Sequence, residues 1–172
     1  MATVWLDGCS GCHMSFLDID ERLITLAESA DLVYSPLVDA KVFPNDVDVT
    51  LVEGAVSSEE DLHKIRIVRE RTKILVSLGD CAVTANVPGM RNRFPPQAVY
   101  ERAYCENVTL EPGIPDQVVP RLLPQARPIH EFVAVDVFVP GCPPSADTIF
   151  YVVSELLAGR QPALSSRTRF GA

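Results

Sequence analysis

Positive charge is scarce in this chain. Its 172 residues include 15 lysines and arginines against 23 aspartates and glutamates, which leaves a formal net charge of −8. An acidic surface repels nucleic acid and anionic membranes, and no run of basic residues interleaved with aromatics offsets this charge. We therefore expect neither nucleic acid nor a membrane surface as a partner.

Long apolar runs and an export signal are also missing. The stretch TIFYVVSELLAG (148–159) is interrupted by Ser154 and Glu155, and it is shorter than the roughly 20 apolar residues that span a bilayer. Residues 1–7 carry neither a positive charge nor a long apolar segment, unlike a secretion signal. We expect a soluble, cytoplasmic protein without membrane insertion.

The number of cysteines is odd, which argues against a framework of structural disulfides in a chain without an export signal. The five are Cys9, Cys12, Cys81, Cys105 and Cys142. With 47% apolar and 22% charged residues, the composition is typical of a globular protein. We expect a single domain over residues 1–172, in which the cysteines bind metal or carry out redox chemistry.

Apolar runs and helical patterns alternate along the chain. Five short apolar segments are typical of strands: 4–6, 31–38, 47–52, 74–78 and 132–139. Three segments have helical spacing: 15–30, 57–71 and 145–157. A capping-box spacing starts at Ser57, and Ser145 is a predicted N-cap.

This alternation predicts an α/β fold with a mostly parallel sheet and helices on both faces. Residues 86–130 hold most of the 14 prolines and no long periodic segment, so we expect an irregular insertion of loops and short helices there. An α+β fold is the alternative, because the proline-rich part could contain an antiparallel hairpin.

Four of the cysteines follow the ends of predicted strands. Cys9 and Cys12 come after 4–6, Cys81 comes after 74–78, and Cys142 comes after 132–139. The carboxyl ends of parallel strands meet at the edge where such folds bind ligands, so we expect these four thiols to converge. Cys105 lies in the irregular segment, and its simplest role is that of a small, partly buried side chain.

Four convergent thiols suit an iron–sulfur cluster or a tetrahedral zinc ion. Structural zinc usually recruits two close pairs, whereas here one close pair accompanies two isolated cysteines, which favours a cubane cluster. A zinc-binding assembly module remains an alternative. A second alternative is a thiol–disulfide oxidoreductase that uses Cys9 and Cys12, although it leaves Cys81 and Cys142 without a role.

The cysteine motifs resemble those of the small subunit of [NiFe] hydrogenases over residues 5–157. The resemblance rests on Cys9-x-x-Cys12, Glu53-Gly54, Leu78-Gly79-Asp80-Cys81 and Pro140-Gly141-Cys142-Pro143-Pro144. The related cluster subunit of respiratory complex I typically begins with adjacent cysteines instead. The segment after Cys142 is short and holds neither cysteine nor histidine, so the chain resembles in particular the small subunit of cytoplasmic NAD-reducing (bidirectional) hydrogenases.

The resemblance implies a flavodoxin-like fold and one [4Fe-4S] cluster on Cys9, Cys12, Cys81 and Cys142, with Glu53 near the cluster edge. It implies an electron-transfer subunit of an NAD-reducing hydrogenase, with partners that comprise a large subunit with the nickel–iron centre and iron–sulfur/flavin diaphorase subunits with FMN and NAD. Hydrogen is then activated in the large subunit. FMN at the same edge of this chain is a secondary expectation, because the cluster would compete for the space.

Three polar residues next to the cysteines have simpler expected roles. His13 could relay protons, but a loop histidine bonded to the backbone is the simpler expectation. Asp7 and Asp80 flank cysteines and are expected to form turns.

Overall fold

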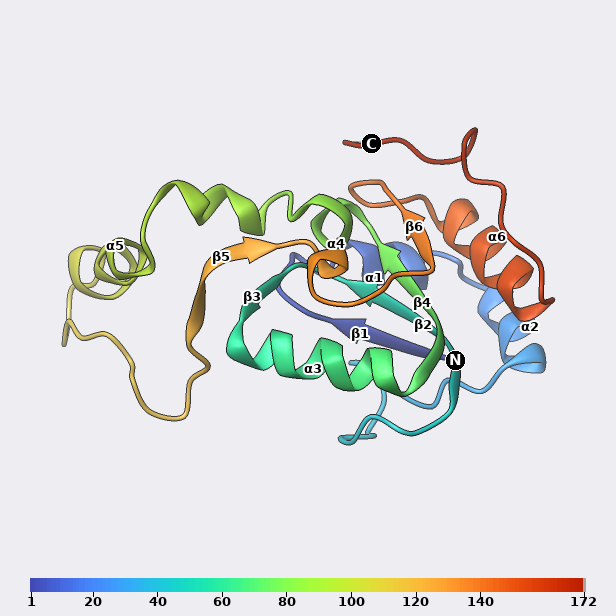
Figure 1. Cartoon of the computed structure of the whole chain (residues 1–172), viewed down its shortest axis with the longest axis horizontal. Helices are drawn as coiled ribbons and strands as arrows, with labels where there is room; N and C mark the ends of the chain where they lie inside the picture. The colour runs from blue at the N-terminus through green and yellow to red at the C-terminus, as the bar shows by residue number, and fades with distance from the viewer. Residues whose placement is uncertain (172) are drawn as a thin grey trace.

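The structure, a computed structural model, describes residues 1–171. Its centre is a four-stranded sheet in the order β1 (Ala2–Trp5), β2 (Val47–Glu53), β4 (Thr72–Leu78) and β6 (Val137–Val139). All three strand pairs are parallel, so the four carboxyl ends lie at one edge of the sheet (Figure 1). The predicted, mostly parallel α/β fold is confirmed.

Helices cover both faces of this sheet (Figure 1). One face packs against α1 (Gly11–Leu17), α2 (Arg22–Ser29) and α6 (Ala146–Leu157), and the other packs against α3 (Glu59–Glu70) and α4 (Asp80–Thr84). Each face of the sheet forms an apolar cluster with its helices, and neighbouring residues of β4 point into opposite clusters. Leu75 packs on the α3 side and Val76 on the α6 side, and both are fully buried. Among the described residues, no helix has the length and hydrophobicity to cross a bilayer.

Serine side chains cap two of these helices close to the predicted positions. Ser58 Oγ accepts a hydrogen bond from the Asp61 backbone N–H at 3.1 Å, and the Asp61 carboxylate accepts one from the Ser58 N–H at 2.9 Å. This capping box starts α3 one residue later than predicted. At the start of α6, Ser145 Oγ accepts from the Thr148 N–H at 3.3 Å, as expected.

The predicted strand at 31–38 is wrong. Within it only Tyr34 pairs with the sheet, through an isolated parallel bridge to Ala2. Pro36 has no N–H to donate to a ladder, and the neighbouring Ser35 hydroxyl accepts a hydrogen bond from the Leu37 N–H at 3.2 Å. The segment therefore runs along the sheet edge as a loop.

Two other predicted elements differ in extent. The predicted helix over 15–30 is divided into α1 and α2, and the break contains Asp20 with a φ of 56°. The predicted strand at 132–139 shortens to β6, because the Phe132 N–H donates to the Ile129 carbonyl oxygen at 3.0 Å and closes a turn after the short helix η3 (Ile129–Glu131).

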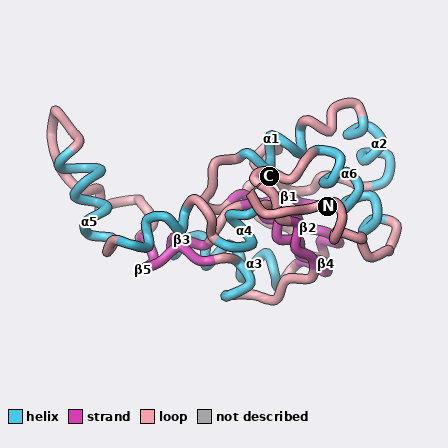
Figure 2. The backbone as a smooth tube through the Cα atoms, turned by 90° about the horizontal axis from the view of Figure 1, so that it is seen from above, coloured by secondary structure: helices cyan, strands magenta, loops and turns pink. Residues whose placement is uncertain are grey.

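The proline-rich segment is irregular, as predicted, and it contributes one strand. Its short helices are η1 (Pro88–Arg93), α5 (Pro96–Glu101) and η2 (Arg102–Glu106). Its strand β5 (Leu122–Arg127) pairs antiparallel with β3 (Val56–Ser58) in a separate two-stranded sheet. Figures 1 and 2 show α5 far from the four-stranded sheet, near the tip of a projection that we call the arm (residues 86–121).

Candidate functional site

The loops after β1, β4 and β6 bring four cysteines to the carboxyl edge of the sheet. Cys9 and Cys12 follow β1, Cys81 lies in the first turn of α4 directly after β4, and Cys142 follows β6. All four line one cavity of about 50 Å³, together with Glu53 at the end of β2. Cys81 is buried and Cys12 half-buried, whereas Cys9 and Cys142 are exposed. The structure thus places the four thiols together, and their role as ligands stays a prediction.

Glycines allow the loops to approach these thiols closely. Gly79 has a φ of 82° and a ψ of 162°, a region that residues with a side chain avoid. A Cβ at this position would collide with the Cys12 Sγ. A Cβ on Gly11 would lie 3.3 Å from the Cys9 Sγ, which is also tight. The backbone therefore forms a cradle that side chains would fill.

The size of the cavity limits the groups that fit in it. A single water occupies about 10–15 Å³ of such space, so a cavity of about 50 Å³ accommodates only a compact group. Pockets for organic cofactors usually measure about 300–1,000 Å³. The volume of this cavity therefore gives no support to the expectation that FMN binds at this edge.

A cluster and a single metal ion require different separations between the sulfur ligands. Within residues 1–171, no three His, Cys, Asp or Glu side chains lie close enough together to hold one metal ion. A tetrahedral zinc with Zn–S bonds of about 2.3 Å would need sulfur atoms about 3.8 Å apart. The ligands of a cubane bind different irons and stand farther apart than this.

Burial and like charge oppose ionisation of the inner thiols. Burial raises the pKa of the Cys12 thiol, and the negative charges of Glu53 and the other three thiols raise it further. Burial also raises the pKa of Cys81. Metal ligation requires thiolates, so four thiolates beside Glu53 need a positively charged group between them.

A buried polar network starts at the cavity and includes His13, which lies in α1 and not in a loop. The His13 Nδ1 lies 2.6 Å from Glu53 Oε2, and the His13 backbone N–H donates to the same oxygen at 2.7 Å. The His13 Nε2 lies 3.0 Å from Thr3 Oγ1, which donates to Ser35 Oγ at 2.8 Å. All four residues are at most 8% exposed. The expectation that His13 bonds to the backbone is wrong, because its ring contacts side chains on both sides.

Asn86 is a residue of the site that sequence reasoning missed. Its Nδ2 donates to the Cys142 Sγ at 3.5 Å. The preceding residue, Ala85, ends α4 with a φ of 62° and turns the chain toward the cavity. Cys105 lies on η2 in the arm and is exposed, so its predicted partly buried position is wrong.

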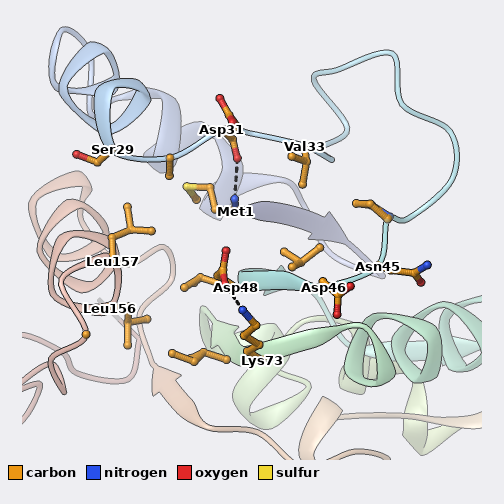
Figure 3. A pocket seen from close by; sticks show the side chains of 16 residues that line it. Met1, Ser29, Asp31, Val33, Asn45, Asp46, Asp48, Lys73, Leu156 and Leu157 are labelled. Atoms are coloured by element: carbon orange, nitrogen blue, oxygen red, sulfur yellow. Dashed lines mark hydrogen bonds and ion pairs between the residues drawn. The ribbon is translucent and has the colours of Figure 1, made fainter.

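A second cavity, of about 590 Å³, lies at the opposite edge of the sheet, where the strands begin (Figure 3). Both of its cationic groups already have hydrogen-bond partners within it. The Met1 ammonium donates to the Asp31 carbonyl oxygen at 2.6 Å, and the Lys73 Nζ donates to the Asp48 carboxylate at 2.6 Å. Ligands of open parallel sheets bind at the carboxyl edge, so we place the functional site at the cysteines.

The fold and the site define the class: this is an α/β protein in which four cysteines lie together at the carboxyl edge of a parallel sheet. The chain belongs to the family of the 20 kDa subunit of NADH ubiquinone oxidoreductase, whose pattern matches residues 9–156. The match includes all four cysteines of the cavity.

Relatives in this family include hydrogenase subunits. The NAD-reducing hydrogenase HoxS subunit delta of Cupriavidus necator is 44% identical over 165 residues, which cover 93% of this chain and 79% of the relative. The sulfhydrogenase 2 subunit delta of Pyrococcus furiosus is 30% identical over 157 residues, which cover 91% of this chain and 61% of the relative. The chain thus spans most of the first relative and a smaller share of the second.

Solved structures agree with this assignment. A chain of an NAD⁺-reducing [NiFe]-hydrogenase in the H2-reduced state matches with a TM-score of 0.93 and 40% identity, over 98% of this chain and 97% of that one. A [NiFeSe]-hydrogenase chain from Dm. baculatum, with a TM-score of 0.56 and 19% identity over 61% of its length, shares the fold alone. The predicted resemblance to the small subunits of NAD-reducing hydrogenases, and with it a role as an electron-transfer subunit of an oxidoreductase, is confirmed.

Proposed function

We propose that this chain is a single domain that carries one [4Fe-4S] cluster on Cys9, Cys12, Cys81 and Cys142. The cluster would pass single electrons between the nickel–iron centre of a hydrogenase large subunit and an iron–sulfur/flavin module that reduces NAD. The observation that carries the proposal is the common cavity of the four thiols, in which burial and Glu53 disfavour thiolates unless a cationic group is present.

The chain's own residues would hold and orient this group. The cradle at Gly79 and Gly11 leaves space for it, and Asn86 donates a hydrogen bond to the Cys142 sulfur. His13 fixes the Glu53 carboxylate through two hydrogen bonds to one oxygen. Fully paired buried networks of this kind are rigid, which preserves the positions of groups around a metal centre.

The exposed features of the chain support the proposed partners. Cys9 and Cys142 are open to solvent, so a cluster on them would need a covering protein surface. The arm exposes large apolar side chains, with Met90 71%, Phe94 59% and Leu110 84% exposed. Exposed apolar side chains such as these are available for a protein–protein contact. We assign these two surfaces to the hydrogenase large subunit and the diaphorase subunits.

The nickel–iron centre belongs in the large subunit, because Cys105 is the single cysteine left once four hold the cluster. The cytoplasm is the compartment that we propose for the complex. No disulfide joins the cysteines within residues 1–171, which suits a reducing compartment.

Iron and acid-labile sulfide analysis of the anaerobically purified complex with the large subunit tests this proposal. We expect iron and sulfide in equal amounts, beyond the iron of the large subunit, and an EPR signal on reduction. Cys81→Ser and Cys142→Ser should both lose the sulfide and the signal. Cys105→Ser is the matched control and should retain both.

Retention of the signal in both ligand variants would show that the ligand set is wrong. A wild-type complex with stoichiometric zinc and no labile sulfide would establish the zinc alternative. A colourless chain with a titratable disulfide between Cys9 and Cys12 would establish the thiol–disulfide alternative.

A further inference from the structure

Asp80 ties two of the cysteine loops together. It is the first residue of α4 and is 4% exposed. Its backbone N–H donates to the Gly141 carbonyl oxygen at 2.9 Å, and its Oδ1 accepts a hydrogen bond from the Gly141 N–H at 2.7 Å. This reciprocal pair joins the residue before Cys81 to the residue before Cys142. Asp80 therefore links two separate loops, whereas the sequence predicted only a role in a local turn.

The second oxygen of the same carboxylate holds the C-terminal tail, which we define as residues 160–171. The Asp80 Oδ2 accepts a hydrogen bond from the Gly171 N–H at 2.6 Å. The tail also contacts α6: the Arg167 guanidinium lies 4.0 Å from the Tyr151 ring centroid, and the Arg167 carbonyl oxygen accepts from Thr148 Oγ1 at 3.1 Å. Figure 1 shows the tail running back from the end of α6 toward the end of β6.

Backbone N–H groups are the hydrogen-bond donors to this carboxylate in the described part of the chain, where no ion pair involves Asp80. A buried carboxylate is stable only while its oxygen atoms are hydrogen-bonded. Loss of the Gly171 donor therefore leaves negative charge without a partner beside the cysteine cavity, which Asp80 lines. The tail and the cysteine loops are thus linked through one side chain.

We propose that Asp80 is a positioning residue through which the docked tail sets the reduction potential of the cysteine-bound group. Asp80 also holds the loops of Cys81 and Cys142 in fixed positions relative to each other. This inference rests on the proposed function, because it concerns the environment of the cluster. The tail donates to Asp80 Oδ2 and so offsets part of the carboxylate charge that faces the cavity.

Two perturbations of this link have opposite effects on the potential. Undocking the tail leaves Asp80 Oδ2 without its donor, so more negative charge faces the cluster and the potential falls. Replacing the carboxylate by an amide removes that charge, and the potential rises even though the tail loses its acceptor. A residue that only stabilised the fold would not reverse the sign.

The test uses the complex with the large subunit and three variants. Arg167→Ala weakens the tail contact with Tyr151 and leaves Asp80 intact. Asp80→Asn retains an oxygen for the Gly141 N–H. Asp136→Asn is the matched control, because Asp136 also accepts from a backbone N–H, that of Leu75 at 2.7 Å, but precedes β6 at the opposite edge of the sheet.

Two measurements follow each variant: the rate of trypsin cleavage after Arg169, and an EPR-monitored redox titration. We expect cleavage to rise about tenfold in Arg167→Ala and Asp80→Asn, the scale of one lost hydrogen bond to a charged group. The potential should fall in Arg167→Ala and rise in Asp80→Asn, with neither quantity changed in Asp136→Asn.

Unchanged cleavage in Asp80→Asn, or a shift of both potentials in the same direction, would overturn the inference. A wild-type complex without an EPR-active cluster would instead overturn the proposed function. In that case the cleavage rates would still decide whether Asp80 holds the tail.

Discussion

The cradle around Cys12 is tested most directly by Gly79→Ala. At the φ and ψ of Gly79, 82° and 162°, any residue with a Cβ costs about 1–3 kcal/mol. The new methyl group would also collide with the Cys12 Sγ, and Cys12 packs against the apolar core, which restricts its movement. We therefore expect the free energy of unfolding of the cluster-free chain to fall by about 1–3 kcal/mol, and the iron content of the complex to fall as the thiol is displaced.

Gly159→Ala is the matched control. Gly159 has a φ of 72°, but a Cβ there would meet nothing within 4 Å. This variant should lose about 1–2 kcal/mol in urea unfolding monitored by circular dichroism, with the iron and sulfide content of the complex unchanged. If both variants lost iron equally, or if Gly79→Ala retained all of it, the argument that this glycine reserves space beside Cys12 would be refuted.

Three further predictions concern single side chains. Asn86→Ala should lower the reduction potential in an EPR-monitored titration, because the Cys142 sulfur loses a hydrogen-bond donor; an unchanged potential would contradict this. In the cluster-free chain at pH 8, iodoacetamide should alkylate Cys12 more slowly than the exposed Cys105, because burial and negative neighbours raise the pKa of Cys12; peptide mass spectrometry would show the order. Burial alone would raise the pKa of Asp136, but hydrogen bonds from a backbone N–H and a guanidinium outweigh it and hold that pKa below its usual value. Its carboxylate therefore stabilises the fold at pH values above its unfolded pKa, and this stabilisation is lost as the pH falls through the lowered pKa of the folded state. At neutral pH, Asp136→Asn should lower the free energy of unfolding by less than about 1 kcal/mol. In unfolding curves measured at acidic pH, this difference from the wild type should disappear.

The meeting of the four cysteines could be predicted because it depends on topology alone. Each follows a short apolar segment, and parallel strands deliver their carboxyl ends to one edge. The serine caps of α3 and α6 could be predicted for a similar reason, since a cap depends on residues three positions apart.

The contacts that complete the site could not be predicted, because they join residues far apart in the chain. Asn86 and Cys142 are 56 positions apart, and Asp80 and Gly171 are 91 apart. No local pattern marks such pairs. The predicted strand at 31–38 failed for a different, local reason: its apolar residues resemble a strand, but Pro36 interrupts the hydrogen bonding that a strand needs.

The unequal exposure of the four thiols has a consequence for biogenesis. Cys12 and Cys81 are shielded by the folded protein, whereas Cys9 and Cys142 face outward, so inorganic material can enter an already folded chain from that open side. A large subunit docked there, as proposed, would close the entrance. If the chain carries the proposed cluster, iron and sulfide would have to be inserted before the subunits join, and a chain that joined too early would remain without a cluster.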